Sequence, residues 1–231
     1  MDNEVINLVD YDNPIVKNKA LILTKHHKIL EDMLAALFYY VRDDIKFQFP
    51  NEGDFVPASQ TIKYGYGQCN NKTILYLALC RAINIEARAH FSLIDKKIQR
   101  GLIKGLFYRI IPKKISHCWL EVKVGNMWFP IDSYINDTEY YNVAKKKLRD
   151  RGWNTGYSIA CSKNESSIEL DFENEQFVQM AAVTDDQGAY NDPTEYYKSP
   201  KYRNIPNILT LFIYKIFING VNNRIKKMRY A

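Results

Sequence analysis

The strongest constraint on the fold is a pair of glycines followed by a long apolar, helix-forming run. Residues 65–72 read Gly-Tyr-Gly-Gln-Cys-Asn-Asn-Lys, and most residues from Thr73 to Ile83 are apolar. Two glycines in three residues are typical of a tight, irregular approach of the backbone. A helix that is apolar on nearly every side must be buried on every side. The sequence therefore predicts a central buried helix that ends near Asn84, with Cys69 in its first turn.

The position of Cys69 suggests chemistry. At the start of a helix, free backbone N–H groups and the helix dipole favour a thiolate over a thiol. Thiols in such positions have pKa values lowered from about 8.5 to roughly 3.5–7.5. A lone cysteine is more often only a small buried hydrophobe. The catalytic and the structural interpretation of Cys69 therefore both stand until the rest of the chain is considered.

Composition and charge exclude several classes of protein. The 231 residues, 46% of them hydrophobic, suffice for one sizeable core with room for an appended subdomain. The net charge of +6 is mild and spread along most of the chain. No short tract combines basic residues with stacking aromatics, so nucleic acid is not an expected partner.

The cysteines and histidines indicate neither a disulfide framework nor a metal site. The four cysteines form no CxxC pair, and the four histidines do not join them at zinc-ligand spacing. The N-terminus is acidic, and no apolar signal segment follows it. We therefore expect reduced thiols, a cytoplasmic protein, no metal and no cofactor.

Helical and extended patterns alternate along the first half of the chain. Apolar residues at three- and four-residue steps predict a helix from Asn18 to Asp43. Residues 57–62 could form a short helix that leads into the glycines. After the central helix, 86–93 alternates like a strand, and 105–111 suggests another short strand.

The second informative feature is a β-hairpin. Two alternating runs, 116–124 and 127–132, are separated by Gly125 and Asn126, a strong signal for a two-residue turn. Such a turn predicts three cross-strand pairs: Val124 with Met127, Val122 with Phe129, and Leu120 with Ile131. Pro130 has no N–H to donate, so its strand should be an edge strand or carry a bulge.

The same register brings His117 and Asp132 together. Trp119 would face Asp132, and His117 shares a face with Trp119, so His117 and Asp132 would be diagonal neighbours about 7–8 Å apart. With Cys69 they supply a thiol, an imidazole and a carboxylate, the combination of nucleophile, base and orienting group used in covalent catalysis. A buried strand histidine and a turn-capping aspartate are the structural alternatives.

Six segments occur in an order that carries a family resemblance: 40–45, 58–61, 67–69, 79–88, 117–122 and 128–132. Together they resemble the transglutaminase-like superfamily of papain-type thiol enzymes, over roughly residues 20–135. By that resemblance Cys69 is the nucleophile, His117 the general base and acid, and Asp132 the residue that orients the imidazole. Asn70 and Asn71 depart from the family pattern, in which a small or acidic residue usually follows the cysteine.

The resemblance also implies an oxyanion hole in which the Cys69 N–H is one donor. The side chains of Gln60, Tyr66 and Gln68 are the candidates for the second donor. No acidic cluster resembles the calcium sites of animal transglutaminases.

We expect three units along the chain. Residues 1–135 would form the catalytic core, 136–204 a variable lid or loop extension, and 205–231 an amphipathic basic helix packed on the same domain. The apolar run in the last unit is too short to span a bilayer. Its basic tail is compatible with a membrane surface or an acidic partner, but a docked helix with cations at its C-terminal end is the simpler interpretation.

The predicted fold is α+β, a papain- or transglutaminase-like core. In it a buried Cys-bearing helix packs on an antiparallel β-sheet, with an extra C-terminal helix. The implied chemistry is acyl transfer through a cysteine thioester on a peptide, amide or carrier-bound acyl substrate, with peptide or amide hydrolysis ranked first. The alternatives are an amide-forming acyltransferase or a cyclase, because the fold does not select among them. In a different class, the chain could be a retired domain used for binding.

Overall fold

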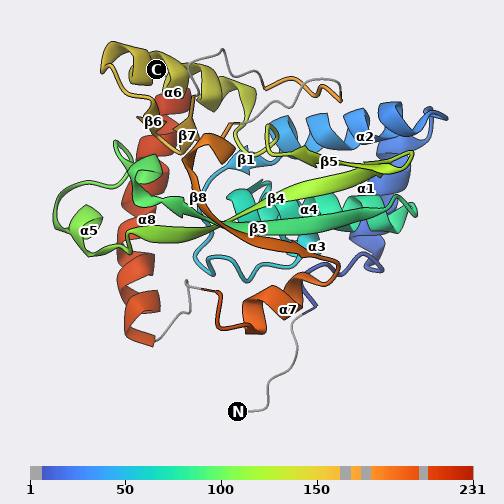
Figure 1. The fold of residues 1–231 in the computed structure, drawn as a ribbon, viewed down its shortest axis with the longest axis horizontal. Coiled ribbons are helices and arrows are strands. Elements are labelled where there is room, and N and C mark those ends of the chain that lie inside the picture. Colours follow the sequence, from blue (N-terminus) through green and yellow to red (C-terminus); the bar gives the residue numbers. More distant parts are fainter. Residues whose placement is uncertain (1–6, 162–167, 173–177, 203–207, 231) are drawn as a thin grey trace.

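A four-stranded antiparallel sheet, in the order β5-β4-β3-β8, forms the centre of the molecule (Figure 1). The computed structural model describes residues 7–161, 168–172, 178–202 and 208–230. The strands of the sheet are β3 (Ala87–Asp95), β4 (Lys114–Val124), β5 (Met127–Ile131) and β8 (Val183–Tyr190). Two short pairs accompany it: β1 (Lys46–Phe47) with β2 (Tyr66–Gly67), and β6 (Thr155–Gly156) with β7 (Ile159–Ala160). The predicted α+β class with an antiparallel sheet is confirmed.

Helices surround this sheet. They are α1 (Pro14–Thr24), α2 (Leu30–Tyr39), α3 (Ala58–Tyr64), α4 (Cys69–Ala82), α5 (Gly105–Ile110), α6 (Thr138–Asp150), α7 (Pro193–Lys198) and α8 (Ile208–Arg229). Short turns of π or 3-10 geometry are η1 (Tyr40–Asp44), η2 (Lys96–Gln99) and η3 (Met180–Ala182). Figure 1 shows α1 and α2 near one end of the sheet, and α5 and α8 near the other.

The central helix α4 is buried as its sequence predicts. Every residue from Asn70 to Cys80 is buried, and the helix contacts β3 and β4 as well as α1, α2 and α3. Its first turn is capped by Gln68, whose side chain accepts the Asn70 N–H, while the Asn71 side chain accepts the Gln68 N–H. Asn84 adopts a left-handed φ of 60° just beyond the helix.

The hairpin has the predicted register. The observed pairs include Val124 with Met127, Val122 with Phe129, and Leu120 with Ile131. β5 is an edge strand of the sheet, as the missing N–H of Pro130 requires.

Two predictions for the first half of the chain are wrong. The helix predicted over 18–43 is two helices, because the polar run 25–28 between them has nothing apolar to bury, and Pro14 with its cap Asn13 starts the first helix earlier. The strand predicted over 105–111 is the helix α5. A short apolar run does not distinguish strand from helix by periodicity.

The range 136–204, predicted as a lid or loops, contains regular elements. α6 buries Tyr140, Ala144 and Leu148 at four-residue spacing, and β8 pairs with β3 as the second edge of the sheet. Both elements are mostly polar because each has a solvent-facing side. Of the predicted ranges, residues 1–6, 162–167, 173–177, 203–207 and 231 lie outside the described residues. The division into three units stays a prediction.

α8 docks on the body of the protein. Among the side chains of this helix that the structure describes, from 212 on, the buried ones are Ile218, Val221, Ile225, Met228 and Arg229. Tyr214 donates to the Pro50 carbonyl at 2.9 Å, and the Asn222 amide bonds both backbone groups of Phe49. Among the described helices, none combines the length and the apolarity needed to cross a bilayer.

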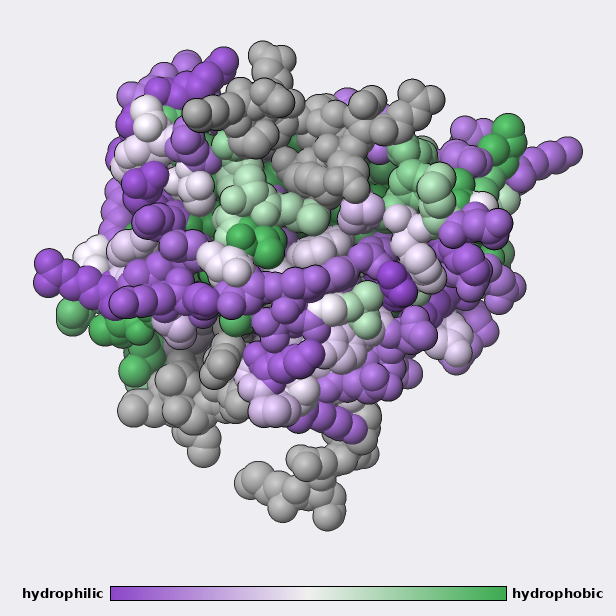
Figure 2. Space-filling view, in the orientation of Figure 1, coloured by the Kyte–Doolittle hydropathy of each residue, from purple (hydrophilic) through white to green (hydrophobic). Residues whose placement is uncertain are grey.

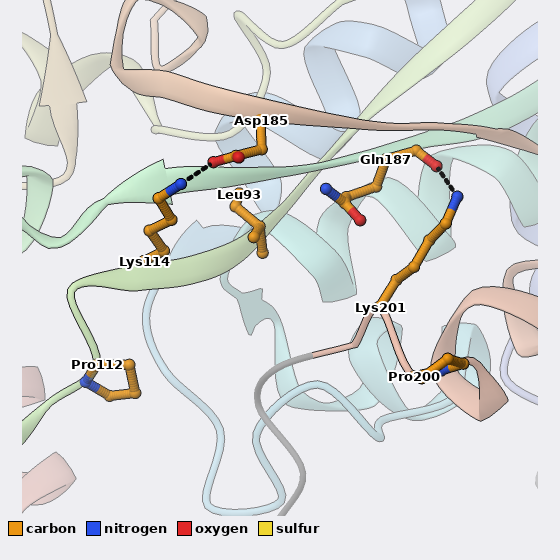
Figure 3. A pocket seen from close by; sticks show the side chains of 7 residues that line it. All are labelled: Leu93, Pro112, Lys114, Asp185, Gln187, Pro200 and Lys201. Atoms are coloured by element: carbon orange, nitrogen blue, oxygen red, sulfur yellow. Dashed lines mark hydrogen bonds and ion pairs between the residues drawn. The ribbon is translucent and has the colours of Figure 1, made fainter.

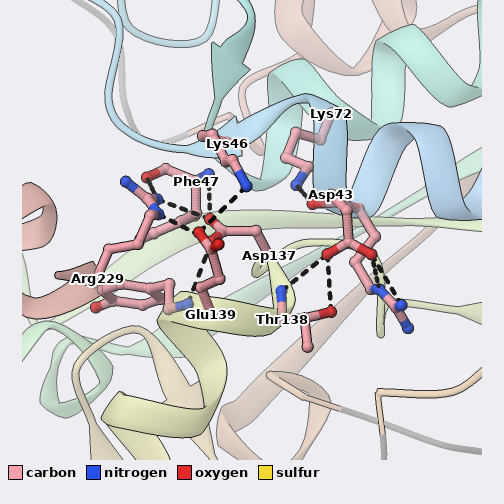
Figure 4. Close-up of polar contacts among 10 residues, drawn as sticks. Asp43, Lys46, Phe47, Lys72, Asp137, Thr138, Glu139 and Arg229 are labelled. Carbon is pink, nitrogen blue, oxygen red and sulfur yellow. Dashed lines mark hydrogen bonds and ion pairs between the residues drawn. The ribbon is translucent and has the colours of Figure 1, made fainter.

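A buried polar network ties α8 to α6 and to the core (Figure 4). Arg229 donates through two nitrogens to the Asp137 carboxylate, at 2.9 and 2.7 Å, and both side chains are at most 2% exposed. Asp137 also accepts the Phe47 N–H at 2.9 Å. Nearby on α4, Lys72 is fully buried and donates to the Arg42 carbonyl, and burial lowers its pKa to about 7.

Candidate functional site

Cys69 is the first residue of α4 and lies against the edge of β4. β5 ends at Ile131, which pairs with Leu120, so β4 extends beyond its partner strand at Cys118. Beyond Leu120, α4 rather than a strand lies along this edge of β4. Thr73 Oγ1 donates to the Cys118 carbonyl at 3.1 Å, and the Cys118 N–H lies close enough to the Cys69 sulfur to lower the pKa of the thiol. The strand that carries His117 is thereby held against the thiol.

Gln68 directs its carbonyl oxygen at the thiol. Its Oε1 lies 2.8 Å from the Cys69 sulfur and accepts the Asn70 N–H, and its Nε2 donates to Asp54 at 2.6 Å. The other Asp54 oxygen accepts the Tyr202 hydroxyl at 2.7 Å. A backbone N–H needs an acceptor and a carboxylate needs a donor, so these contacts allow only one orientation of the amide. The S–H group therefore faces an acceptor.

His117 is fully buried on β4. It faces Ser92 across the pair with β3, and its ring lies 5.9 Å from the ring of Trp119. Neither ring nitrogen of His117 has a hydrogen-bond partner among the residues that the structure describes, nor do Ser92 Oγ and Trp119 Nε1. Buried polar groups are normally paired. Both nitrogens of the His117 imidazole are therefore without a hydrogen bond to any described residue.

Asp132 directly follows β5 and is also fully buried. Its carboxylate accepts the backbone N–H groups of Val178, Gln179 and Met180, at 2.7, 2.7 and 2.9 Å. These bonds fasten the segment before β8 to the end of the hairpin. Within the described residues, they join Asp132 to that segment and no hydrogen bond joins it to His117.

Burial dominates the protonation of all three groups. It raises the pKa of the Cys69 thiol to about 12, with the charge of Asp54 adding to it, although backbone N–H groups lower the value. It lowers the pKa of His117 to about 3, and it raises that of Asp132 to about 6 against three N–H donors. The predicted lowering of the Cys69 pKa is wrong, because desolvation outweighs the helix N-terminus. The resting pair is a neutral thiol and a neutral imidazole.

We expect Cys69 to be alkylated slowly at neutral pH. Only the thiolate reacts with iodoacetamide, so the rate constant should rise about tenfold per pH unit through pH 9 without a plateau. Peptide mass spectrometry of Cys69 measures it, and Cys69→Ser gives the background from the partly exposed Cys161. A plateau below pH 8 would show a thiolate at rest and contradict the expectation.

The thiol opens into a cavity of about 370 Å³. Besides Cys69, the lining includes Ser116, which precedes His117, and Gln179, whose N–H binds Asp132. Cys69 itself therefore lines the cavity, whereas His117 and Asp132 lie behind a chain neighbour and a bonded partner that line it.

A second hollow, of about 510 Å³, holds no comparable chemistry (Figure 3). Its lining consists of Leu93, Pro112, Lys114, Asp185, Gln187, Pro200 and Lys201. Lys114 pairs with Asp185 at 2.6 Å, and Lys201 donates to the Gln187 carbonyl at 3.3 Å. These seven residues include no cysteine and no histidine, so we place the candidate site at the smaller cavity.

The side chains proposed as second oxyanion donors differ in position. Neither Gln60 nor Tyr66 is among the described residues that line the cavity. The Tyr66 ring stacks on the Tyr64 ring. Gln68 does line the cavity, but its amide N–H group donates to Asp54. A backbone N–H that sequence reasoning did not foresee, that of Cys118, lies near the Cys69 sulfur. Within the described residues, no three His, Cys, Asp or Glu side chains are grouped to hold a metal ion.

One protein family and several solved structures are similar to this chain. Residues 18–133 match the family model of the transglutaminase-like superfamily. Solved structures with similarity include a protein from Cytophaga hutchinsonii, provisionally named a cysteine protease, at 19% identity and a TM-score of 0.43 over 57% of this chain and 42% of that one. A provisionally named protease from Parabacteroides distasonis matches at 11% identity and a TM-score of 0.37, over 55% of this chain and 26% of that one. The chain thus spans less than half the length of either. No curated protein matches it.

Proposed function

The chain belongs to the transglutaminase-like superfamily, and on that premise we propose that it is a thiol enzyme that transfers acyl groups through a thioester on Cys69. The observation that carries the proposal is the setting of the sulfur atom. It opens into a cavity, lies near the N–H of Cys118, and lies against the strand that bears His117, whose imidazole has no hydrogen-bond partner among the described residues.

In the proposed reaction, the Cys69 sulfur attacks the carbonyl carbon of a peptide or amide bond. His117 takes the thiol proton and passes it to the leaving amine, which departs as the C–N bond breaks. Water then attacks the thioester, releasing a carboxylic acid and restoring the thiol. The N–H groups of Cys69 and Cys118 are the candidates for stabilising the oxyanion in both steps.

In the proposed site, Asp132 is the residue that orients the imidazole of His117. The observed pairing of β4 with β5 ends at Leu120 and Ile131, and Asp132 is the next residue along the chain. If that register continued by one pair, Asp132 would be a diagonal neighbour of His117. The three N–H groups from 178–180 hold the carboxylate in one place. In the active state that we propose, one nitrogen of the His117 ring donates to this carboxylate.

Hydrolysis is our first choice among the reactions open to such a site. Amide-forming transfer remains the second candidate, because the mainly apolar lining of the cavity limits the water that competes with an incoming amine. Offering the acylated protein water alone, or water with a series of primary amines, separates the two by the mass of the released product.

The proposal predicts an acyl-enzyme that depends on His117. Intact-protein mass spectrometry after mixing with a reactive acyl donor should show one added acyl group on Cys69. His117→Ala should slow its formation about 10²–10⁴-fold, because the general base is lost. Equal rates in the two proteins would contradict the mechanism, and no adduct on either would favour the binding-module alternative. Thermal melts of both proteins show whether the fold survives.

We expect activity to fall as the pH drops below about 6. Burial raises the pKa of Asp132 to about 6, so the carboxylate is charged and able to hold the imidazole above that pH, and protonated below it. The pH profile of kcat/KM for the wild type should show this acid limb. Asp132→Asn should lower kcat/KM across the range and remove the limb. An unchanged limb in the variant would assign it to another group.

A further inference from the structure

The cavity beside Cys69 has walls that are mostly apolar. They come from the segment after β1, the end of the sheet, α5 with its flanks, and α8. The apolar residues are Phe47, Phe49, Phe55, Ile94, Ile103, Phe107, Ile110, Ile111, Pro112, Ile115, Ile213 and Ile218. Hydrogen bonds of Tyr214 and Asn222 fasten α8 to 49–50, so these walls are held in position without a ligand.

The polar side chains in the lining are bonded to one another, to backbone, or to side chains behind the lining, as Glu52 is to Tyr64 and Ser116 is to Tyr196. Asp54 accepts from Gln68 and Tyr202. The Ser158 hydroxyl donates to Gln99, and the Gln179 amide donates to the Ser158 carbonyl at 2.6 Å. A ligand with polar groups would have to displace these bonds or bury its own groups unpaired, and either is costly.

The charge of the lining and the volume of the cavity limit further which ligands can fit. Of the described residues that line the cavity, the charged ones are Glu52 and Asp54, both acidic, so a carboxylate or phosphate inside would be repelled. At ~30 Å³ for a group of water size, 370 Å³ holds about a dozen such groups. That matches one aromatic side chain or a medium-length aliphatic chain.

Apolar surface continues outward from the cavity over α5 and α8. Ile110 lines the cavity and is also exposed, and Phe107 stacks on Phe217 of α8 with ring centroids 4.3 Å apart. Figure 2 shows hydrophobic residues at the surface on this side of the molecule. Apolar surface that leads into a pocket is typical of a binding site for an apolar ligand.

We propose that this cavity binds the acyl group of the substrate, and that the acyl group is bulky, apolar and uncharged. The inference rests on the proposed thioester chemistry for its link to Cys69. The cavity would select acyl donors by the group attached to the reacting carbonyl carbon. It would exclude acyl groups that carry a carboxylate of their own.

Acyl thioesters of N-acetylcysteamine are suitable donors for the experiment. The Cys69 sulfur attacks the thioester carbonyl, the C–S bond to N-acetylcysteamine breaks, and the thiol proton of Cys69 ends on the released thiol. Water then frees the carboxylic acid. We expect octanoyl and 3-phenylpropanoyl donors to exceed the acetyl donor by at least about 100-fold in kcat/KM, since each buried methylene contributes about fourfold. The succinyl donor should not exceed acetyl. The octanoyl and phenylpropanoyl arms distinguish a fatty acyl from an aromatic source.

A matched pair of variants on α8 tests whether the cavity causes the expected preference for octanoyl over acetyl donors. Ile213 lines the cavity, whereas Ile216 is exposed and does not line it. Ile213→Trp should lower the octanoyl-to-acetyl ratio at least about tenfold. Ile216→Trp, which makes the same change on the same helix, should leave the ratio at its wild-type value.

A binding measurement separates this inference from the proposed function. 2-Decanone carries a similar chain without a leaving group, and isothermal titration should show that it binds the wild type and the Ile216→Trp protein but not Ile213→Trp. Binding in this pattern without any acyl-enzyme would support the cavity and refute the nucleophile. Equal acylation by acetyl, octanoyl and succinyl donors would overturn the inference while supporting Cys69. Absence of both acylation and binding would refute both.

Discussion

Replacing Cys69 by alanine is expected to lower kcat/KM for acyl transfer by at least about 10³-fold, because the atom that forms the covalent intermediate is removed. Steady-state hydrolysis of an octanoyl thioester, corrected for the spontaneous rate, measures the loss. The fold should persist, since the Cys69 side chain borders the cavity and the capping contacts of Gln68 and Asn71 do not involve it.

Cys80 provides the control for this variant. It lies in the same helix and is fully buried. Cys80→Ala removes one buried sulfur far along α4 from the cavity, so it should cost on the order of 1 kcal/mol of stability and leave kcat/KM within about threefold. If Cys69→Ala kept more than a tenth of the wild-type rate, the thioester would not be on the reaction path.

The largest effect on stability is expected at the buried pair of Asp137 and Arg229. Arg229→Met leaves the Asp137 carboxylate buried without its charge partner, which should cost about 3–5 kcal/mol. For a chain of this size such a loss lowers Tm by about 10–15 °C. Thermal unfolding followed by circular dichroism at neutral pH measures the change.

An exposed ion pair in the same network gives the comparison. Lys46 and Glu139 lie 3.4 Å apart, with side chains 37% and 58% exposed (Figure 4). Glu139→Ala should change stability by less than about 1 kcal/mol. The double variant Asp137→Leu with Arg229→Met should lose less than the sum of the two single variants, because neither charge is left alone. Equal losses for Arg229→Met and Glu139→Ala would show that the buried pair contributes little.

The sequence alone was sufficient to predict the elements that depend on a local apolar pattern. α4 is apolar all round, and the two-residue turn at Gly125 and Asn126 fixes the register of β4 and β5. From these two features the packing of the Cys69 helix on the antiparallel sheet could be predicted, and the family resemblance came from six ordered segments that include parts of them. The break between α1 and α2 was missed because the flanking apolar residues fit a single helical period across it.

Elements stabilised by distant contacts could not be predicted in this way. β8 reads as polar and loop-like, and its strand character appears only when β3 offers an edge to pair with. Asp54 and Tyr202 are 148 residues apart, and no periodicity links them to Gln68. The direction of the Cys69 pKa shift was likewise beyond the sequence, because it depends on how deeply the helix terminus is covered.

The contact between Gln68 and the thiol has a consequence for the lifetime of the protein. Peroxide oxidises the thiolate form of cysteine, and over-oxidation to sulfinic acid is generally irreversible. With an oxygen acceptor facing its S–H and burial opposing ionisation, the sulfur stays in its least oxidisable form while the cavity is empty. In the proposed reaction, vulnerability to oxidants would be confined to the short interval in which an arriving substrate draws the proton onto His117.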